Sequence, residues 1–457
     1  MSLRTDSGDI SPSVDRNGLA LRRSSGSENR APDVVGRRRP RLLFLTYAFP
    51  PMNAIGCVRA YNIAKWLTRR GWEVTAVTPY EAAWGQATDV MTLHEDLCHQ
   101  GIRCIRTPHH WRSLLPILID RRKHFLSWAG GGICRRLAAI LGIEREVGWI
   151  ADAAKACAGL NPDDVDLILA SGPPFGSFEL ARRLAERLER PFVLDYRDLW
   201  AGNPYAKRSA RSGPIEKEKA LLAASSAVIG ISPSLVQSLR SQFGLTQTVK
   251  VITNGFDPEE LARIPRHAFG HFAIVYTGQF YPPKSTVDPL MAALRTIDRA
   301  GSEQPHWAFH YYGYQGEYVR SVARGFGVEH RVVIGGRVPR PAALAAVRGA
   351  DIAVVISSVY EQGSLQDKGV VTGKVFEAIG LGTPLLVIAP AGSDLEEVLA
   401  VTGLGKRFAG TEIDGIAGFL RDVMNGGIPR ALSAELFSWS NISHQFDHAL
   451  REAGGRR

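Results

Sequence analysis

The sequence predicts an α/β protein that contains two successive, doubly wound parallel sheets. Short apolar runs of the type found in strands buried on both faces alternate with segments of helical periodicity along most of the chain. This alternation stops near residues 256–271 and then begins again. Strands that alternate with helices form parallel sheets, so we expect two Rossmann-like domains that face a central cleft.

The first domain is expected at residues 41–256. Its apolar runs are short and end at Pro, Gly or polar residues, as buried strands do. Helical spacing of apolar residues separates the runs. We expect strands at 41–47, 73–79, 166–171, 191–198, 227–232 and 249–254, and helices at 58–71, 177–189 and 233–243.

The second domain is expected at residues 272–428, after a linker at 257–271. A C-terminal helix at 429–457 is expected to return to the first domain. Ligands of doubly wound sheets bind beyond the carboxyl ends of the strands, so the active site is expected in the cleft between the domains. We expect strands at 272–277, 307–312, 331–334, 351–356 and 384–389.

Two segments lack this alternation. Residues 1–40 mix Ser, Gly, Asp and Arg without periodicity and predict a disordered basic tail. Residues 109–146 interleave Trp, Leu and Phe with Arg and Lys. Such a basic amphipathic insertion is typical of an element that lies on an anionic membrane surface. It is equally typical of an inserted helical hairpin that packs on its own domain with solvated arginines, and both interpretations remain open.

The composition limits the cellular compartments and the kinds of partner that fit this protein. The 457 residues are 45% hydrophobic and 22% charged, which excludes a mainly disordered protein, and the net charge of +10 favours anionic partners. Five cysteines without a C-x-x-C pair argue against a disulfide framework or a zinc ribbon. No apolar run approaches the ~18 to 20 residues of a bilayer span, and the N-terminus has no signal-peptide pattern. We therefore expect a cytoplasmic protein.

The strongest local motif lies at Gly373, Lys374 and Glu377. Lys374 and Glu377 are three residues apart, which places both on one face of a helix that begins after Gly373. At that helix N-terminus Lys374 can neutralise a diphosphate and Glu377 can accept hydrogen bonds from ribose hydroxyls. An ordinary surface ion pair is the alternative. The chain has neither a complete Walker A loop nor a G-x-G-x-x-G motif, so no nicotinamide or flavin cofactor is expected.

Several motifs occur in a recognisable order. They are Pro50-Pro51 with Gly56 and Arg59, Gly172-Pro173-Pro174, Asp195-Tyr196-Arg197-Asp198, Asn254-Gly255-Phe256-Asp257, Thr277-Gly278, and Gly373-Lys374-Val375-Phe376-Glu377. This arrangement resembles glycosyltransferase family 4, whose members are retaining enzymes of the GT-B fold. The resemblance covers residues 41 to about 450 and is closest to the branch that builds bacterial surface polysaccharides. It implies a donor domain after the linker and an acceptor domain before it.

The resemblance also implies roles for residues. Donor-binding residues would be Gly56, Arg59, Gly278, Gln279, Lys284, Val338, Gly373, Lys374 and Glu377. The acceptor side would carry Asn53, Asp195, Arg197 and Asp198, and the catalytic residues would be Asp198, Lys374 and Glu377. One position departs from the family: many members carry a second Glu beside the transferred sugar where this chain has Gly369, and Asp367 and Glu361 are out of register.

The resemblance implies a hexosyltransferase that moves a sugar from a nucleoside diphosphate sugar to a hydroxyl acceptor. We expect a lipid-linked or glycan acceptor, work at the inner face of the cell membrane, no required metal or cofactor, and no nucleic-acid partner. A nucleotide-sugar epimerase and a non-catalytic nucleotide-sugar-binding relative are the alternatives. His444 and His448 have a spacing that can ligate zinc, but no third ligand is apparent and we favour a helix surface, which is sufficient to explain them.

Overall fold

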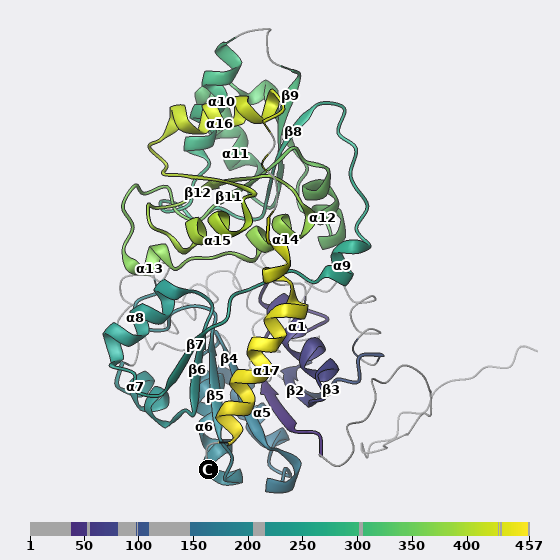
Figure 1. Cartoon of the computed structure of the whole chain (residues 1–457), viewed down its shortest axis with the longest axis vertical. Coiled ribbons are helices and arrows are strands. Elements are labelled where there is room, and N and C mark those ends of the chain that lie inside the picture. The colour runs from purple at the N-terminus through teal and green to yellow at the C-terminus, as the bar shows by residue number, and fades with distance from the viewer. Residues whose placement is uncertain are drawn as a thin grey trace, which may run out of the picture. The chain divides into compact units, whose positions relative to one another are not determined.

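The computed structural model describes residues 38–52, 55–80, 97, 99–108, 147–203, 215–300, 305–427, 429 and 432–455 (Figure 1). The expected tail up to residue 37, the insertion at 109–146 and Asn53 lie outside these residues. No helix of the described part is both long and apolar enough to cross a bilayer.

The first sheet has seven parallel strands in the order β3-β2-β1-β4-β5-β6-β7. Its centre is apolar, because strands such as β1 (Arg41–Leu45) and β4 (Leu167–Gly172) are buried on both faces. Residue Leu42 of β1 pairs with Val74 on one side and with Leu167 on the other. The remaining strands are β2 (Glu73–Pro79), β3 (Arg103–Thr107), β5 (Phe192–Tyr196), β6 (Ala227–Gly230) and β7 (Thr248–Val251).

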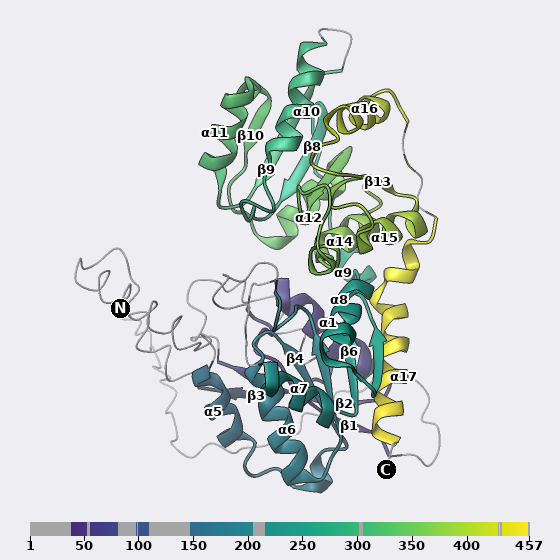
Figure 2. The ribbon, with the colours of Figure 1, turned by 90° about the vertical axis from the view of Figure 1, so that its left-hand side faces the viewer.

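Helices cover both faces of this sheet (Figure 2). One apolar cluster joins the sheet to helices on one face, and a second joins it to α1 (Ile55–Arg69) on the other. Helix α8 begins at Pro233, where Ser232 accepts a hydrogen bond from the Leu235 N–H, as an N-cap residue does. The first face carries α5 (Val147–Ala156), α6 (Gly176–Leu188), α7 (Ile215–Ala224) and α8 (Pro233–Phe243), with a 3₁₀ turn at Pro162–Asp164.

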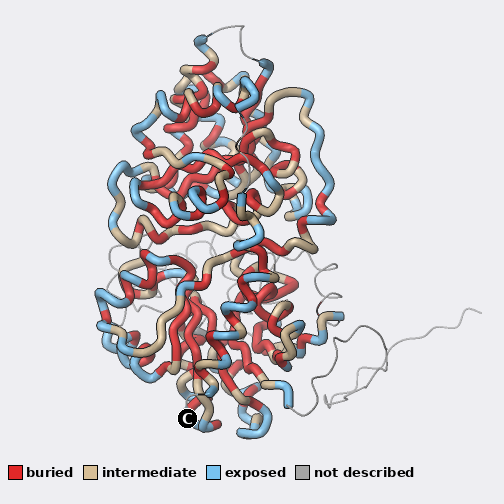
Figure 3. The backbone as a smooth tube through the Cα atoms, in the orientation of Figure 1, coloured by how far each residue is buried: buried red, intermediate tan, exposed pale blue. Residues whose placement is uncertain are grey.

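The second sheet has six parallel strands in the order β10-β9-β8-β11-β12-β13. It follows helix α9 (Pro258–Ala262), and its inner strands β8 (Phe272–Thr277) and β11 (Ile352–Ile356) are almost entirely buried (Figure 3). The other strands are β9 (Trp307–Tyr312), β10 (Val332–Ile334), β12 (Leu385–Ile388) and β13 (Gly405–Phe408). Two parallel sheets with alternating helices confirm the predicted fold class.

Two helical layers also enclose the second sheet. One layer contains α10 (Asp288–Arg299), α11 (Gly316–Phe326) and α16 (Ile413–Met424). The opposite layer contains α12 (Arg340–Gly349), α14 (Gly373–Leu381) and α15 (Asp394–Thr402). Short connecting elements are α13 (Leu365–Lys368) and 3₁₀ turns at Glu329–Arg331 and Ala434–Phe437.

The last helix, α17 (Trp439–Gly455), packs against α1 and the first sheet (Figure 1). Its residues Trp439, Ile442 and Phe446 are at most 1% exposed. Burial of a side chain such as Ile442 or Phe446 contributes about 1.5 to 3 kcal/mol, so this apolar face holds the helix on the first sheet. The Trp439 indole N–H also donates to the Gly255 carbonyl (3.1 Å).

The sequence did not predict two edge strands, β3 and β13. Each contains two basic residues and is only partly buried, so neither shows the apolar run on which the other predictions depend. Predicted strands at 191–198 and 249–254 are also longer than β5 and β7, which end at Tyr196 and Val251. In both places the residues after the strand form a loop at its carboxyl end.

Candidate active site

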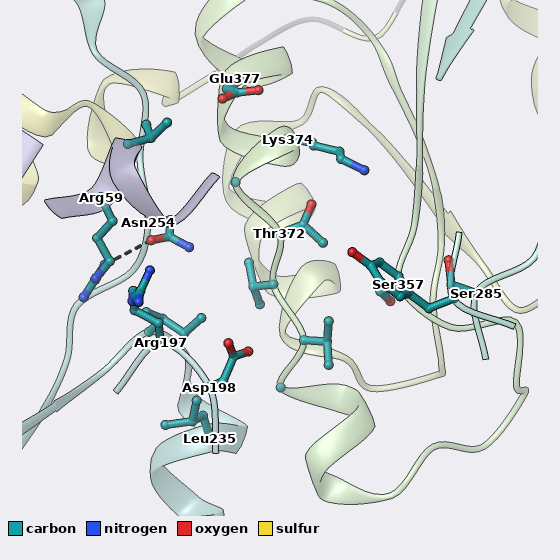
Figure 4. A pocket seen from close by; sticks show the side chains of 18 of the residues that line it. Arg59, Arg197, Asp198, Leu235, Asn254, Ser285, Ser357, Thr372, Lys374 and Glu377 are labelled. Carbon is teal, nitrogen blue, oxygen red and sulfur yellow. Dashed lines mark hydrogen bonds between the residues drawn. The ribbon is translucent and has the colours of Figure 1, made fainter. Parts of the chain in front are cut away.

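A cavity of about 430 Å³ lies at the carboxyl ends of strands from both sheets (Figure 4). The first sheet contributes the residues that follow β5, β6 and β7, and the second contributes those that follow β8 and β11. The wall also includes the start of α1, Leu235 of α8, Gln366 of α13, the segment that leads into α14, the start of α14, and Trp439. Loops at the carboxyl ends of parallel strands are where doubly wound proteins bind their ligands, so this cavity is the candidate active site.

The N-terminus of α14 opens into the cavity. Its N-cap residue Thr372 and its first residues Gly373 and Lys374 all line the wall. The buried Thr372 hydroxyl has no hydrogen-bond partner among the described residues. Free N–H groups and the positive end of the helix dipole attract an anion, and an unpaired hydroxyl adds a donor. This turn is therefore suited to phosphate.

The Lys374 side chain lines the cavity and extends over Tyr276 of β8. Its ammonium lies 4.8 Å from the ring centre of Tyr276. A side chain at Gly278 would place its Cβ 2.3 Å from Lys374 Nζ, and Gly278 also has a positive φ of 116°. The positive φ favours glycine there, and a side chain would also displace the end of Lys374. Burial lowers the pKa of Lys374 to about 8, although Glu377 acts in the opposite direction.

Glu377 lies one turn further along α14 and also lines the cavity. Its side chain is 12% exposed, and its Oε1 accepts a hydrogen bond from Arg340 Nη1 (2.5 Å). Among the described residues, Glu377 and Lys374 do not form an ion pair, so the surface-pair interpretation of this motif is wrong. Arg340 was missed by the sequence analysis because nothing near it marks it as more than the start of a helix.

Arg59 approaches the cavity from α1 and is 3% exposed. Its Nη2 donates to Asp195 Oδ1 (2.7 Å), and Ser171 donates to the other oxygen of the same carboxylate (2.8 Å). Arg59 Nη1 also donates to the side chain of Asn254, which lines the cavity (3.2 Å; Figure 4). Arg59 thus fixes the loop after β7, and Asp195 neutralises its charge.

Arg197 and Asp198 follow β5 and line the cavity on the same side as Arg59, facing α14 (Figure 4). Arg197 Nε donates to the Gly172 carbonyl (3.3 Å), and its guanidinium lies so close to Gly56 that a Cβ there would be 2.2 Å from Nη1. The Asp198 side chain is exposed and opens onto the cavity, where the protein atoms around it desolvate the carboxylate. This desolvation raises the pKa of Asp198 to about 6, against the effect of Arg197. Asp198 can therefore accept or release a proton near neutral pH.

Family comparisons identify the two halves of the chain. A model of the glycosyl transferase 4-like domain matches residues 57–255, and a model of glycosyl transferases group 1 matches residues 271–416. The two matched segments contain the strands and loops that form the cavity. The chain belongs to the family 4-like glycosyltransferases. None of the curated proteins matches it.

Solved structures show the same fold. Sucrose-phosphate synthase from Thermosynechococcus elongatus is 17% identical with a TM-score of 0.61, and the match covers 91% of this chain and 99% of that chain. HepE from Anabaena, in complex with UDP and glucose, is 16% identical with a TM-score of 0.58 over 90% and 99%. The lipopolysaccharide outer core galactosyltransferase WaaB is 12% identical with a TM-score of 0.53 over 90% and 99%. The fold of this glycosyltransferase is GT-B.

The cavity of the glycosyltransferase gathers most of the residues singled out in the sequence. Those that line it are Gly56, Arg59, Arg197, Asp198, Gln279, Gly373, Lys374 and Glu377. Asp195 does not line it, because it lies within β5 and its side chain faces Arg59 on α1. Lys284 forms an ion pair with Asp367, and neither it nor Val338 is part of the wall. Asn53 lies outside the described residues.

Gly369 lines the cavity at the position where many family members carry a glutamate. A Cβ there would lie 3.0 Å from the backbone nitrogen of Leu235 and 3.2 Å from Ser232 Oγ. Asp367 is bound by Lys284 and Ser364, and Glu361 is exposed outside the cavity. Neither of these two carboxylates therefore replaces the missing one.

No group of three or more His, Cys, Asp or Glu side chains suited to a metal occurs among the described residues. His444 contacts Arg70 Nη1 through Nδ1 (2.7 Å) and is exposed on α17, as is His448. The helix-surface interpretation therefore accounts for these histidines.

Proposed function

We propose that this glycosyltransferase moves a sugar from a nucleoside diphosphate sugar to a hydroxyl acceptor. The observation that carries the proposal is one cavity with two unlike walls. The α14 wall offers helix N–H groups, the Thr372 hydroxyl and the Lys374 ammonium, which suit a diphosphate. The wall after β5 offers Asp198, which suits an acceptor hydroxyl. The complex of HepE with UDP and glucose supports a donor of this class.

The two walls divide the reaction between them. As the bond from the anomeric carbon to the diphosphate breaks, negative charge grows on the leaving oxygen, and Lys374 and the α14 N–H groups stabilise it. Asp198 holds the acceptor hydroxyl against the sugar. We propose that the anomeric configuration is retained and that the leaving diphosphate takes the acceptor proton, as the family resemblance implies. Lysine and a helix N-terminus neutralise the diphosphate, so no metal is required.

The acceptor is proposed to be lipid-linked and to serve cell-surface polysaccharide biosynthesis. Leu199, Ile231 and Leu235 form an apolar stretch of the wall beside Asp198, which suits an acceptor with an apolar part. The basic amphipathic segment at 109–146 and the net charge of +10 favour a position at the inner, anionic face of the cell membrane. Structural neighbours include WaaB, a lipopolysaccharide outer core galactosyltransferase.

Thermal unfolding with a panel of nucleotide sugars tests the donor. A ligand at about 100 times its dissociation constant adds about 2.7 kcal/mol to the free energy of unfolding, which gives a clear shift. Glu377→Ala should weaken binding by about 1.5 to 3 kcal/mol, since a charge-assisted hydrogen bond is lost. Glu397→Ala, an exposed glutamate of α15, is the control. If no nucleotide sugar shifts the unfolding temperature, the proposal is wrong.

Product analysis separates the proposal from its two alternatives. A transferase forms a new glycoside only when an acceptor is present. An epimerase would release a rearranged sugar without any acceptor, and a non-catalytic relative would bind the donor but form no product. Gly369 is the observation that favours the non-catalytic alternative, because it leaves the sugar without the carboxylate that many relatives carry. Mass spectrometry of reactions with and without a lipid acceptor decides among the three.

A further inference from the structure

Arg340 joins three helices behind the cavity. It is the first residue of α12, and its side chain is 23% exposed. Its Nε donates to Glu260 Oε1 (2.8 Å) and its Nη2 to Glu260 Oε2 (3.1 Å), so the carboxylate on α9 holds the guanidinium in a bidentate pair. Its remaining Nη1 donates to Glu377 Oε1 on α14 (2.5 Å). Arg340 is thus fixed on one side and directed at Glu377 on the other.

This arrangement leaves one oxygen of Glu377 for a ligand. Among the described residues Glu377 has no other side-chain hydrogen bond, and the residue lines the cavity. Burial by itself lowers the pKa of Arg340, but the carboxylates of Glu377 and Glu260 raise this pKa above its ordinary value. The guanidinium therefore stays charged. A planar guanidinium with fixed N–H directions restricts the carboxylate that it binds far more than a flexible ammonium does.

The same contact keeps Glu377 apart from Lys374. Residues three apart on a helix are natural ion-pair partners, and a pair between these two would occupy both the cation and the carboxylate of the site. Arg340 offers Glu377 a stronger, partly buried partner (Figure 4 shows Lys374 and Glu377 on successive turns of α14). Lys374 then remains available to an anion in the cavity.

We propose that Arg340 is a positioning residue for the donor. It orients Glu377 so that the second carboxylate oxygen receives the ribose hydroxyls of a nucleoside diphosphate, and it leaves Lys374 to the phosphates. This inference rests on the proposed function, because it requires a nucleotide in the cavity. Arg340 does not line the cavity and touches no substrate; it acts through Glu377.

Calorimetry with ribose and deoxyribose nucleotides tests the inference. UDP and GDP are each compared with their 2′-deoxy forms, and the ratio of the two dissociation constants measures recognition of the hydroxyl. We expect the wild type to bind the ribose form about tenfold more tightly, which corresponds to about 1.4 kcal/mol. In Arg340→Gln the ratio should fall to about one, while binding of the deoxy form changes little.

Arg348→Gln is the matched control. Arg348 lies on the same helix and donates to the carbonyls of Leu261 (3.1 Å) and Ile264, so it also ties α12 to the segment around α9 but does not touch Glu377. Its loss should leave the ratio unchanged. Glu260→Gln weakens the bidentate pair that holds Arg340, and Arg340→Lys keeps the positive charge but loses the planar guanidinium. Both variants should give intermediate ratios. They replace Arg340→Gln in the test if that variant does not fold.

Each outcome has one meaning. If the wild type binds neither UDP, GDP nor any nucleotide sugar, the proposed function fails and the inference fails with it. If the wild type binds the nucleotides but Arg340→Gln keeps the full preference for ribose, the inference alone is overturned. A fall of the ratio in Arg348→Gln equal to that in Arg340→Gln would show a general structural role and would also overturn it.

Discussion

Desolvation acts in opposite directions on two side chains of the cavity. It lowers the pKa of Lys374 to about 8 and raises that of Asp198 to about 6, because it disfavours the charged form of each group. The charges that the proposed reaction uses, a cation for the diphosphate and a carboxylate for the acceptor, are therefore both present only between these two values. This window defines two predictions at the scale of single residues.

The first prediction is that binding of UDP or GDP weakens as pH rises through about 8. Below this value Lys374 is protonated in the free protein, and above it the diphosphate must first draw a proton onto the amine, which lowers affinity by up to about tenfold per pH unit. Titration calorimetry over this range measures the effect. Lys374→Arg should bind with little dependence on pH, since guanidinium stays charged. A flat profile in the wild type would contradict the assignment.

The second prediction is that transfer requires the Asp198 carboxylate. As pH falls through about 6 the carboxylate gains a proton, so kcat/KM for the acceptor should fall with it. Asp198→Ala should reduce transfer by about 10²-fold, because the acceptor hydroxyl is no longer held in place, and should change nucleotide affinity little. Asp414→Asn, at an exposed position of α16, is the control. Loss of nucleotide affinity without loss of transfer per bound donor would place Asp198 on the donor side instead.

At the scale of elements, helix α8 makes close contact with the segment before α14. Ser232 Oγ donates to the Gly369 carbonyl (2.9 Å), and the backbone and hydroxyl of Ser234 donate to the two oxygens of Asp394 (2.9 and 2.7 Å). The Asp394 carboxylate lies at the positive end of the α8 dipole, which strengthens this contact. The first turn of α8 therefore fills the space next to residue 369.

The third prediction follows from that packing. Gly369→Glu, which restores the residue that many relatives carry, should lower the free energy of unfolding by about 1 to 3 kcal/mol, because its Cβ meets the backbone of Leu235. It should also fail to raise transfer. Chemical denaturation measures the first effect and a transfer assay the second. Gly418→Glu on α16, where a Cβ has open space, should change stability by less than about 0.5 kcal/mol. A stable and more active Gly369→Glu protein would refute this account of the site.

The net charge of the whole molecule concerns a different anion from the one in the cavity, namely an anionic membrane surface. The protein has a net charge of +10. Asp195 holds Arg59 and the Gly172 carbonyl holds Arg197, whereas Lys374 remains available to an anion in the cavity. The net positive charge of the whole sequence favours a large anionic surface. The prediction at this scale concerns a membrane surface and rests on the sequence at 109–146, outside the described residues.

The fourth prediction is reversible binding to anionic vesicles that weakens as salt rises. Each basic residue near an anionic surface contributes about 1 kcal/mol, and at physiological ionic strength the Debye length of about 8 Å screens this attraction. Replacement of Arg121, Arg122 and Lys123 by Gln should lower flotation with vesicles and activity on a lipid acceptor, but not donor binding. The control replaces the exposed Arg182, Arg183 and Lys217. A protein that stays unbound at low salt has no such docking site.

Local sequence patterns were enough to predict the two sheets and the helix that carries Lys374 and Glu377. Strands at 73–79, 272–277 and 307–312 have the predicted bounds, because apolar, β-branched and aromatic residues dominate each of them. The spacing of Lys374 and Glu377 likewise predicted that both lie on α14. These features depend on residues that are close together in the chain, so they can be predicted from local sequence patterns.

The partners of these side chains depend on contacts between distant parts of the chain, which local sequence patterns do not show. Arg59 lies 136 residues from Asp195, and Arg340 lies 80 residues from Glu260 and 37 from Glu377. An arginine at the start of a helix has the same local pattern whether it faces solvent or a carboxylate. Its partner depends on how helices from distant parts of the chain pack on their sheets, and burial then sets the protonation of groups such as Lys374 and Asp198.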